Sequence, residues 1–260
     1  MQMVRFSALA IAVALAATFN GVGAEPWSAD GMDKPIKKEV VDFGPSPYYP
    51  AGRVRIKLTC YFYAKLMVKQ YDAGQKGAEW LSFTPIQKAG APVCVESHGP
   101  GEKVIDGGEW SGYFRGVKGN LVFLDAADGT DLGIPFAVYD SVTRKKIFED
   151  SAYDSRIENR EVEQSLFNRM RVATAADGTV ILKYLRVADA GCDLHAKKVP
   201  CWEDVRKKFD LKNLQPPVCV RYKNLPTAWE SAIAYPVESS LSVKPETKTI
   251  AGPIRCWPAD

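Results

Sequence analysis

The sequence predicts a mainly β protein with a single antiparallel, β-sandwich-like domain and one short helix. Three observations lead to this prediction: a stretch of alternating apolar and polar residues from 54 to 68, several short runs rich in β-branched and aromatic residues, and turn-forming dipeptides beside those runs. Alternation with a period of two gives one buried and one wet face, which favours an antiparallel sheet.

The first 24 residues have the three parts of an export signal. Arg5 supplies a basic start, an apolar stretch runs from 6 to 19, and small residues stand at Val22 and Ala24. We expect cleavage after Ala24. The apolar stretch is shorter than the roughly 20 residues that cross a bilayer, and no later stretch is long enough. We therefore expect an extracytoplasmic protein, periplasmic or secreted, with no transmembrane segment in the mature chain.

The six cysteines all follow the export signal, and this even number predicts three disulfides in an oxidising compartment. Short loops close most easily, so sequential pairing is expected. A zinc site is not expected, because no Cys-x-x-Cys spacing occurs and the only histidines are His98 and His195. In chain order, the expected pairs are Cys60 with Cys94, Cys192 with Cys201, and Cys219 with Cys256.

Behind the signal, residues 25–52 are rich in proline and are expected to form an extended arm, followed by a disulfide-stabilised β domain over 53–260. In the 54–68 stretch the even positions, including Cys60, are expected in the core and the odd positions in water. A helix is expected over 200–209, with Trp202, Val205 and Phe209 on one face. The stretch 155–171 fits either a helix or a polar strand. Further strands are expected at 80–84, 93–95, 121–124, 134–139, 180–187, 218–222 and 233–237.

Two hairpins are expected at Asp128-Gly129 and Asp177-Gly178, because Gly accepts the positive φ of a tight turn. Both lie in the string Ala-Ala-Asp-Gly-Thr, at 126–130 and 175–179. A repeat at this spacing is typical of a β-propeller-like fold, which is the alternative to the sandwich. Recurrence of one favoured turn explains the string more simply.

The sequence contains few candidates for catalytic or ligand-binding residues. The net charge is only +3 and the cations are interleaved with acids, which argues against a nucleic-acid partner. No hydrolase, nucleotide or metal motif occurs, and no cofactor is expected. Catalytic residues stay unassigned. The best catalytic candidate is the loop with Glu96, Ser97, His98 and Glu102, although loop histidines are more often solvated, and the same applies to His195.

Three acids, Asp125, Asp128 and Asp131, surround Gly129 and resemble a calcium loop in composition. The register does not fit, because aligning Gly129 with the invariant glycine of an EF-hand puts Leu124 at the first ligand position. We interpret the segment as a hairpin and expect no metal site.

The odd positions of the alternating stretch form the one candidate binding surface. Tyrosine rings offer flat faces for stacking, and Arg and Lys pair with carboxylate or phosphate, so this row could bind an anionic envelope polymer. Such a row is more often a solvated face that keeps a sheet soluble. Its candidate residues are Arg53, Arg55, Lys57, Tyr61, Tyr63 and Lys65.

Together these observations predict an exported, non-catalytic binding or structural module of the cell envelope or exterior. Its expected partner is an anionic envelope polymer or another exported protein. The alternative is a secreted carbohydrate-active hydrolase with paired carboxylates, which have no fixed spacing in sequence because only their spatial separation matters.

The mature protein is expected to begin at Glu25 and to contain no free thiol. Intact mass and thiol titration of denatured, unreduced protein measure both properties. A reactive thiol in protein recovered from its own compartment would contradict the three-disulfide prediction.

Overall fold

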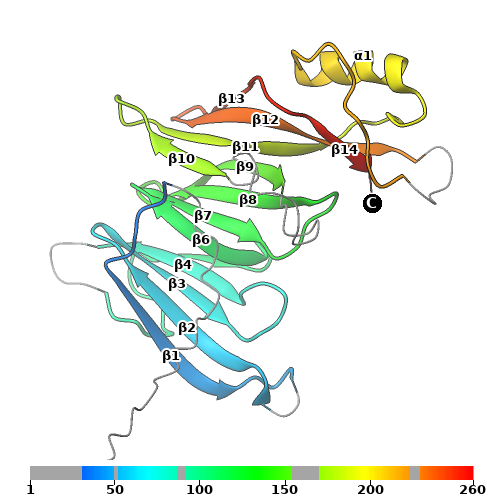
Figure 1. Cartoon of the computed structure of the whole chain (residues 1–260). Helices are drawn as coiled ribbons and strands as arrows, with labels where there is room; N and C mark the ends of the chain where they lie inside the picture. The colour runs from blue at the N-terminus through cyan, green and yellow to red at the C-terminus, as the bar shows by residue number, and fades with distance from the viewer. Residues whose placement is uncertain (1–30, 50–51, 87–91, 154–169, 223–228, 260) are drawn as a thin grey trace, which may run out of the picture.

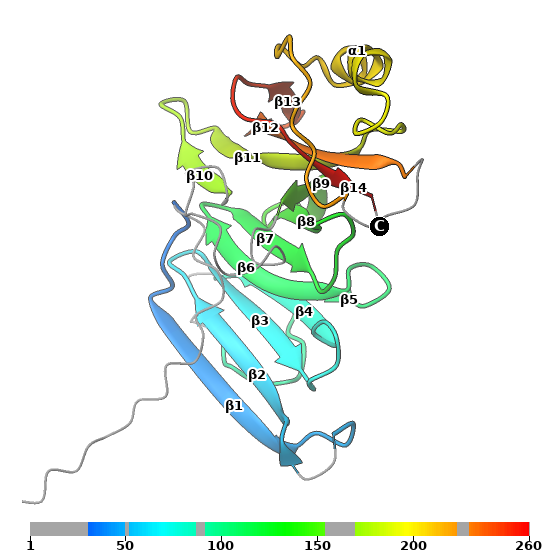
Figure 2. The ribbon, with the colours of Figure 1, turned by 45° about the vertical axis from the view of Figure 1, so that its right-hand side comes forward.

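The computed structural model describes residues 31–49, 52–86, 92–153, 170–222 and 229–259. Within them the chain forms two antiparallel sheets, neither closed into a barrel, and one helix, which confirms the mainly β prediction (Figures 1 and 2). The export signal and nearly all of the ambiguous 155–171 stretch lie outside the described residues. No helix among the described residues is long and apolar enough to cross a membrane.

The first sheet has five strands in chain order, each antiparallel to the next. Part of the segment expected to be an extended arm forms its first strand, which lies at the free edge of the sheet (Figure 1). The strands are β1 (Lys37–Pro45), β2 (Arg55–Phe62), β3 (Leu66–Asp72), β4 (Trp80–Pro85) and β5 (Lys103–Asp106).

The second sheet has nine strands, and the order along its main path is β13-β12-β11-β9-β8-β7-β6. Two short strands extend it, because β10 pairs with one end of β11, and β14 pairs with β12 beside β13. The strands are β6 (Gly112–Lys118), β7 (Leu121–Ala126), β8 (Gly133–Asp140), β9 (Lys145–Tyr153), β10 (Arg171–Thr174), β11 (Val180–Asp189), β12 (Ser231–Leu241), β13 (Glu246–Thr249) and β14 (Arg255–Pro258).

The helix α1 (Lys198–Phe209) packs on the second sheet, with Trp202 and Val205 in its core and Phe209 partly buried against it. The predicted helical face is therefore correct. The helix begins two residues earlier than expected, so its first turn holds no acid, whereas Arg206, Lys207 and Lys208 stand in the last turn as expected.

Most of the expected strands form, and the expected turn at Asp177-Gly178 joins β10 to β11, with Gly178 at positive φ. The turn expected at Asp128-Gly129 is displaced: between β7 and β8 the positive φ angles belong to Asp131 and Leu132, which lie between the bridged residues Thr130 and Gly133. Two expected strands are absent from the described residues. Residues 93–95 lie in a loop, and within 218–222 only Cys219 forms a bridge, to Cys256. Both segments are fixed by disulfides instead of by a ladder.

The 54–68 stretch is a hairpin, so the prediction of one long strand was wrong. β2 ends at Phe62, β3 begins at Leu66, and the Tyr63 amide donates to the Leu66 carbonyl over 2.8 Å. Phe62 pairs with Met67 across the turn, so even positions of β2 and odd positions of β3 share one face. The first four residues of β3 are all buried, and a strand buried on both sides gives no alternating signal that would reveal the reversal.

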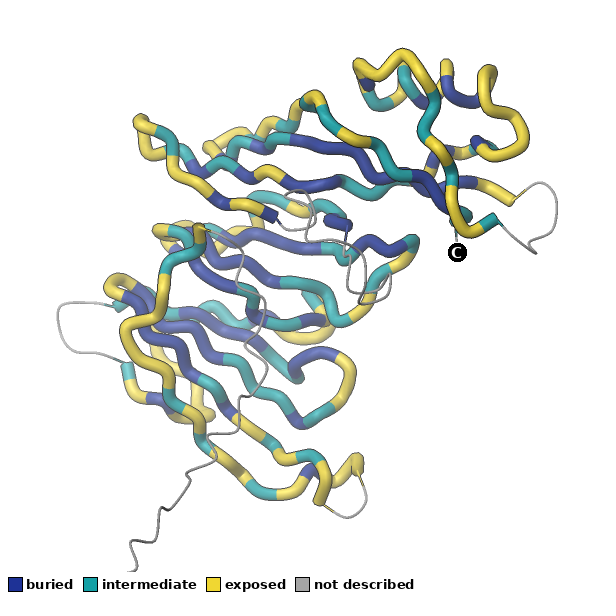
Figure 3. Tube along the Cα trace, viewed as in Figure 1, coloured by how far each residue is buried: buried dark blue, intermediate teal, exposed yellow. Residues whose placement is uncertain are grey.

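The five-stranded sheet has buried residues on both of its faces, and Figure 3 shows its middle strands as largely buried and the edge strand β1 as mostly exposed. On its inner face, Tyr61 and Tyr63 pack with Phe114 and Val117 of β6 in a core that both sheets share. Its outer face carries Leu58, Cys60, Phe62, Met67 and Cys94. Leu58, Cys60 and Phe62 are buried as expected and Ile56 is partly buried, but Tyr61 and Tyr63 do not face water.

All six cysteines are paired, and in the expected sequential order. Cys60–Cys94 joins β2 to the loop before β5. Cys192–Cys201 joins the segment after β11 to α1, and Cys219–Cys256 joins a loop to β14. Each bridge thus fastens a segment with little regular structure to a sheet or the helix.

Burial on both faces predicts that neighbouring residues of β2 are equally important for stability. Tyr61→Ala and Phe62→Ala should each lower the free energy of unfolding by about 3 to 5 kcal/mol, because each leaves a core cavity. Lys57→Ala, on the exposed part of the same strand, should change it by less than about 0.5 kcal/mol. Urea unfolding measures all three. A neutral Tyr61→Ala would contradict the shared core.

Candidate functional site

The outer face of the five-stranded sheet carries a row of aromatic side chains. Tyr71 of β3 and Trp80 of β4 are directly paired across the strands, with ring centroids 5.4 Å apart and planes within 4° of parallel. Phe43 of β1 lies 5.8 Å from Tyr71 on one side, and His98 lies 4.7 Å from Trp80 on the other, edge to face. We call these four residues the aromatic strip.

The four side chains of the aromatic strip remain partly accessible to solvent although they pack against the sheet. Phe43 is 42% exposed and the His98 side chain 41% exposed, and Tyr71 and Trp80 are half-buried. Grouped aromatic rings that remain accessible on the face of a sheet are a feature of interaction sites.

The strip continues into a loop, residues 92–102, that we call the outer loop. Its first part is bonded to the sheet by Cys60–Cys94, and its second part by a buried ion pair. The Lys69 ammonium lies 3.1 Å from the Glu102 carboxylate, and the two side chains are only 3% and 2% exposed. Lys69 also donates to the Ser97 carbonyl over 2.9 Å.

The Glu102 carboxylate is surrounded by hydrogen-bond donors. The Gly99 amide donates to Oε2 over 2.8 Å, His98 Nδ1 lies 3.2 Å from Oε1, and the Ser82 hydroxyl donates to Oε1. Burial alone would raise the pKa of Glu102, but the bonds from Ser82, Gly99, His98 and Lys69 outweigh it and hold the pKa below its ordinary value of 4.5. The group is therefore a charged structural centre at neutral pH.

These contacts fix the orientation of His98. A carboxylate only accepts hydrogen bonds, so Nδ1 must carry the proton that points to Glu102. In the neutral ring Nε2 is then an acceptor, on a side chain that is partly exposed beside Trp80. The geometry thus offers one oriented polar group at the end of the aromatic strip.

The loop does bring His98 and Glu102 together, as a catalytic role would require, but the order of the hydrogen-bonded groups does not suit a triad. A nucleophilic triad needs the histidine between the serine and the carboxylate. Here Glu102 lies between Ser82 and His98. The hydroxyl that reaches the carboxylate comes from β4 and not from Ser97, and a carboxylate with this many donors is poorly suited to exchange a proton with a substrate.

Nearby acidic groups affect the pKa of Tyr71 at the centre of the aromatic strip. Burial raises the pKa of the Tyr71 hydroxyl above its ordinary value, and the charges of Glu96 and Glu79 raise it further, followed by the Tyr48 hydroxyl. Tyr71 is thus a neutral hydrogen-bond donor with two carboxylates near it. Of these two acids Glu96 is exposed, whereas Glu79 Oε1 is buried.

The row of odd positions from the sequence does not form a continuous surface. Its two tyrosines lie in the core, and Tyr61 is covered further by the Lys38 ammonium at 5.3 Å from the ring. Arg55 is paired with Asp42 at the sheet edge. The exposed members are Arg53, Arg55, Lys57 and Lys65.

The other candidates have local partners. Asp125 bonds to Arg115 over 2.7 Å and Asp128 bonds to Lys76, and the described residues contain no group of three or more side chains that could hold a metal. His195, which lies between Cys192 and Cys201, stacks on Tyr222 with ring centroids 4.5 Å apart.

Sequence reasoning missed the aromatic strip and the burial of Lys69. Phe43, Tyr71, Trp80 and His98 come from three strands and a loop, so only the strand register places them together. A signal existed for Lys69: if Ala64-Lys65 is treated as a turn, the odd positions of β3 align with the apolar even positions of β2.

The Glu102→Gln variant should lower the free energy of unfolding by about 3 to 5 kcal/mol at pH 7, because it leaves the Lys69 ammonium buried without a countercharge. The double variant Lys69→Met, Glu102→Leu should be less destabilised than Glu102→Gln. Chemical denaturation measures both. A neutral Glu102→Gln would mean that the pair is not buried.

Acid should weaken the same interaction. Since folding lowers the pKa of Glu102, its contribution to stability is fully present above the ordinary value of 4.5 and is lost as pH falls through the lower folded value. The double variant lacks both charges, so the stability gap between it and wild type should change with pH below 4.5 and stay constant above about 6.

Comparison with protein families, with curated proteins and with solved structures finds no match to this chain. The function proposed below therefore depends on the geometry of the chain itself.

Proposed function

We propose that the mature protein is an exported, non-catalytic module that binds a glycan chain along the aromatic strip. The parallel, stacked pair of Tyr71 and Trp80, half-buried on the outer face of the five-stranded sheet, carries this proposal. Flat rings stack on the apolar faces of sugar rings, and Tyr and Trp combine a large apolar area with few rotatable bonds. The strip extends over several rings, which suits an extended ligand.

The polar groups around the strip suit hydroxyl groups. In the neutral ring, His98 Nε2 is an acceptor, and the exposed carboxylate of Glu96 near Tyr71 also accepts hydrogen bonds. The same carboxylate repels acidic sugars. We therefore propose a glycan without acidic groups as the ligand, and this differs from the anionic polymer that the cationic row suggested.

The support of the strip is consistent with binding. A disulfide and a buried ion pair hold the outer loop, so little conformational entropy is lost when a ligand contacts His98. The five-stranded sheet below is packed on both faces, and the sandwich-like arrangement that we propose for the two sheets makes it a rigid base.

Tyr71→Ala and Glu96→Gln are the informative variants for this function. Tyr71→Ala should weaken binding to neutral oligosaccharides, such as hexamers of glucose or N-acetylglucosamine, by about 5- to 10-fold, because it removes one stacking ring. Glu96→Gln should reduce the preference for neutral over acidic chains. Trp229→Ala, which removes another exposed aromatic ring away from the strip, is the matched control. Calorimetry or affinity electrophoresis measures the effect.

Three outcomes would contradict the proposal. Equal retention of wild type and Tyr71→Ala would leave the strip without a role in binding. Retention of acidic chains only, lost in an Arg55→Ala, Lys57→Ala double variant, would place the ligand on the cationic row. New reducing ends after incubation would show a hydrolase.

A further inference from the structure

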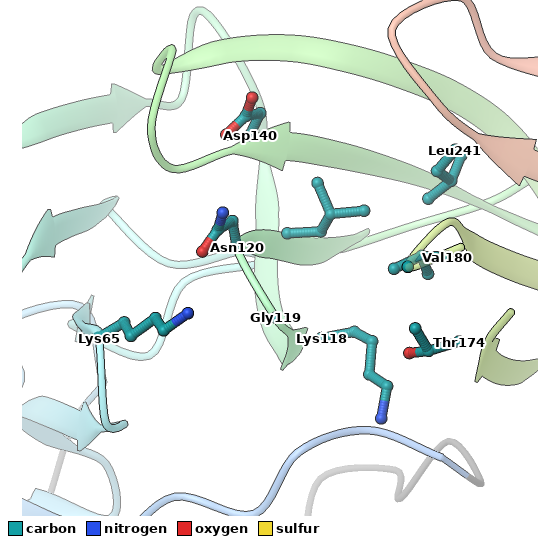
Figure 4. Close-up of a pocket in the computed structure, with 10 residues that line it drawn as sticks. Lys65, Lys118, Gly119, Asn120, Asp140, Thr174, Val180 and Leu241 are labelled. Atoms are coloured by element: carbon teal, nitrogen blue, oxygen red, sulfur yellow. The ribbon is translucent and has the colours of Figure 1, made fainter. Parts of the chain in front are cut away.

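A hollow separate from the aromatic strip lies at the end of the molecule where turns of both sheets meet (Figure 4). Its volume is about 320 Å³. Lys65 comes from the turn between β2 and β3, Asn120 from the turn between β6 and β7, and Asp140 from the end of β8. Val180 and Leu241, from β11 and β12, line it too. This hollow shares no residue with the aromatic strip.

The walls of the hollow are held by the backbone. The Ser141 amide donates to the Asn120 carbonyl over 2.9 Å, and the Ile86 amide donates to the Lys65 carbonyl over 2.8 Å. Asp33 accepts from the Gly119 amide over 2.7 Å and thus fixes the turn between β6 and β7. The hollow is largely pre-formed, as binding pockets for small molecules usually are.

The charged side chains around the hollow are of two kinds, those with an ion-pair partner and those without one among the described residues. Lys118 is neutralised by Asp33, whose carboxylate lies 3.1 Å from its ammonium. Lys65 is exposed and has no ion pair among the described residues. Asp140 accepts the Val142 amide at Oδ1 over 2.8 Å and, like Lys65, has no ion pair among the described residues. One positive and one negative group are therefore left for a ligand.

These groups lie on different sides of the hollow. Figure 4 shows Asp140 at one side, Lys65 at another with Asn120 between them, and Val180 and Leu241 across from both. Val180 and Leu241 are buried to more than nine-tenths and belong to the core of the second sheet. A ligand in the hollow therefore meets a cation, an anion and an apolar wall in three directions.

We propose that this hollow binds a small zwitterion with an apolar side chain, such as a free apolar amino acid. Its carboxylate lies against Lys65 and the Asn120 amide, its ammonium against Asp140, and its side chain against Val180 and Leu241. A simple anion leaves Asp140 unpaired, and a simple cation leaves Lys65 unpaired. Only a ligand with both charges satisfies both side chains.

Three ligands of one shape test this proposal. Leucine has both charged groups, 4-methylpentanoate lacks the ammonium, and 3-methylbutylamine lacks the carboxylate. Titrations of the full mature chain followed by NMR, with the amide signals of Gly119, Gly178 and Val180 as reporters, give the affinity of each. Leucine should bind about two- to fivefold more tightly than either analogue, because each analogue loses one exposed charge pair.

Each charge is then removed in turn. Lys65→Gln should abolish the preference for leucine over 3-methylbutylamine, and Asp140→Asn should abolish the preference over 4-methylpentanoate. Asn keeps the acceptor oxygen that bonds the Val142 amide, so the turn is preserved. Lys207→Gln, an exposed lysine on α1, is the matched control and should change neither preference.

Several results would overturn the proposal. One is the absence of any shift of the reporter signals with leucine. Another is equal affinity for all three ligands. A third is a preference for leucine that survives in both Lys65→Gln and Asp140→Asn. Glycan binding should be unchanged in both variants, so failure here and failure of the aromatic strip are distinguishable.

Discussion

Lys69 places an ammonium group among buried residues on the outer face of the five-stranded sheet, between Cys60 and Ser82 on the neighbouring strands. A buried ammonium requires a countercharge, and Glu102 supplies it. The outer loop must therefore return to the sheet at Glu102, after leaving it at the Cys60–Cys94 bond. His98 lies between these two points, and its contact with Trp80 follows from them. The position of the His98 end of the aromatic strip thus depends on this one ion pair.

The pair is better understood as a determinant of position than of stability. Replacing a buried ion pair with apolar side chains of similar volume often leaves stability unchanged or higher. An apolar pair at 69 and 102 could close the loop, but it would give no acceptor for the Gly99 amide or for His98. The charged pair selects one loop conformation and one orientation of the imidazole ring, and a binding site needs both.

Local signals in the sequence predicted local structure well. The face of α1 and the expected strands β7, β8, β11 and β12 depend on neighbours in the chain, and each cysteine pairs with the next one along it. The hairpin at Ala64-Lys65 was missed because its turn contains no Gly, Pro, Asn or Asp and because β3 is buried on both sides. The aromatic strip could not be predicted, since Phe43, Tyr71 and Trp80 meet only when the register of three strands is known. One residue of shift would turn Tyr71 into the core.

The β2–β3 hairpin uses tyrosine for two opposite purposes. Tyr61 lies between the sheets against Phe114, where its ring fills space in the shared core. Tyr71 lies on the outer face, where its hydroxyl and part of its ring reach solvent. The outer loop covers the cross-strand row of Cys60 and Lys69 and leaves the adjacent row of Tyr71 and Trp80 accessible. Although the outer loop lies beside Tyr71 and Trp80, it leaves part of their apolar surface in water. A ligand that covers this surface gains the hydrophobic free energy of burying it.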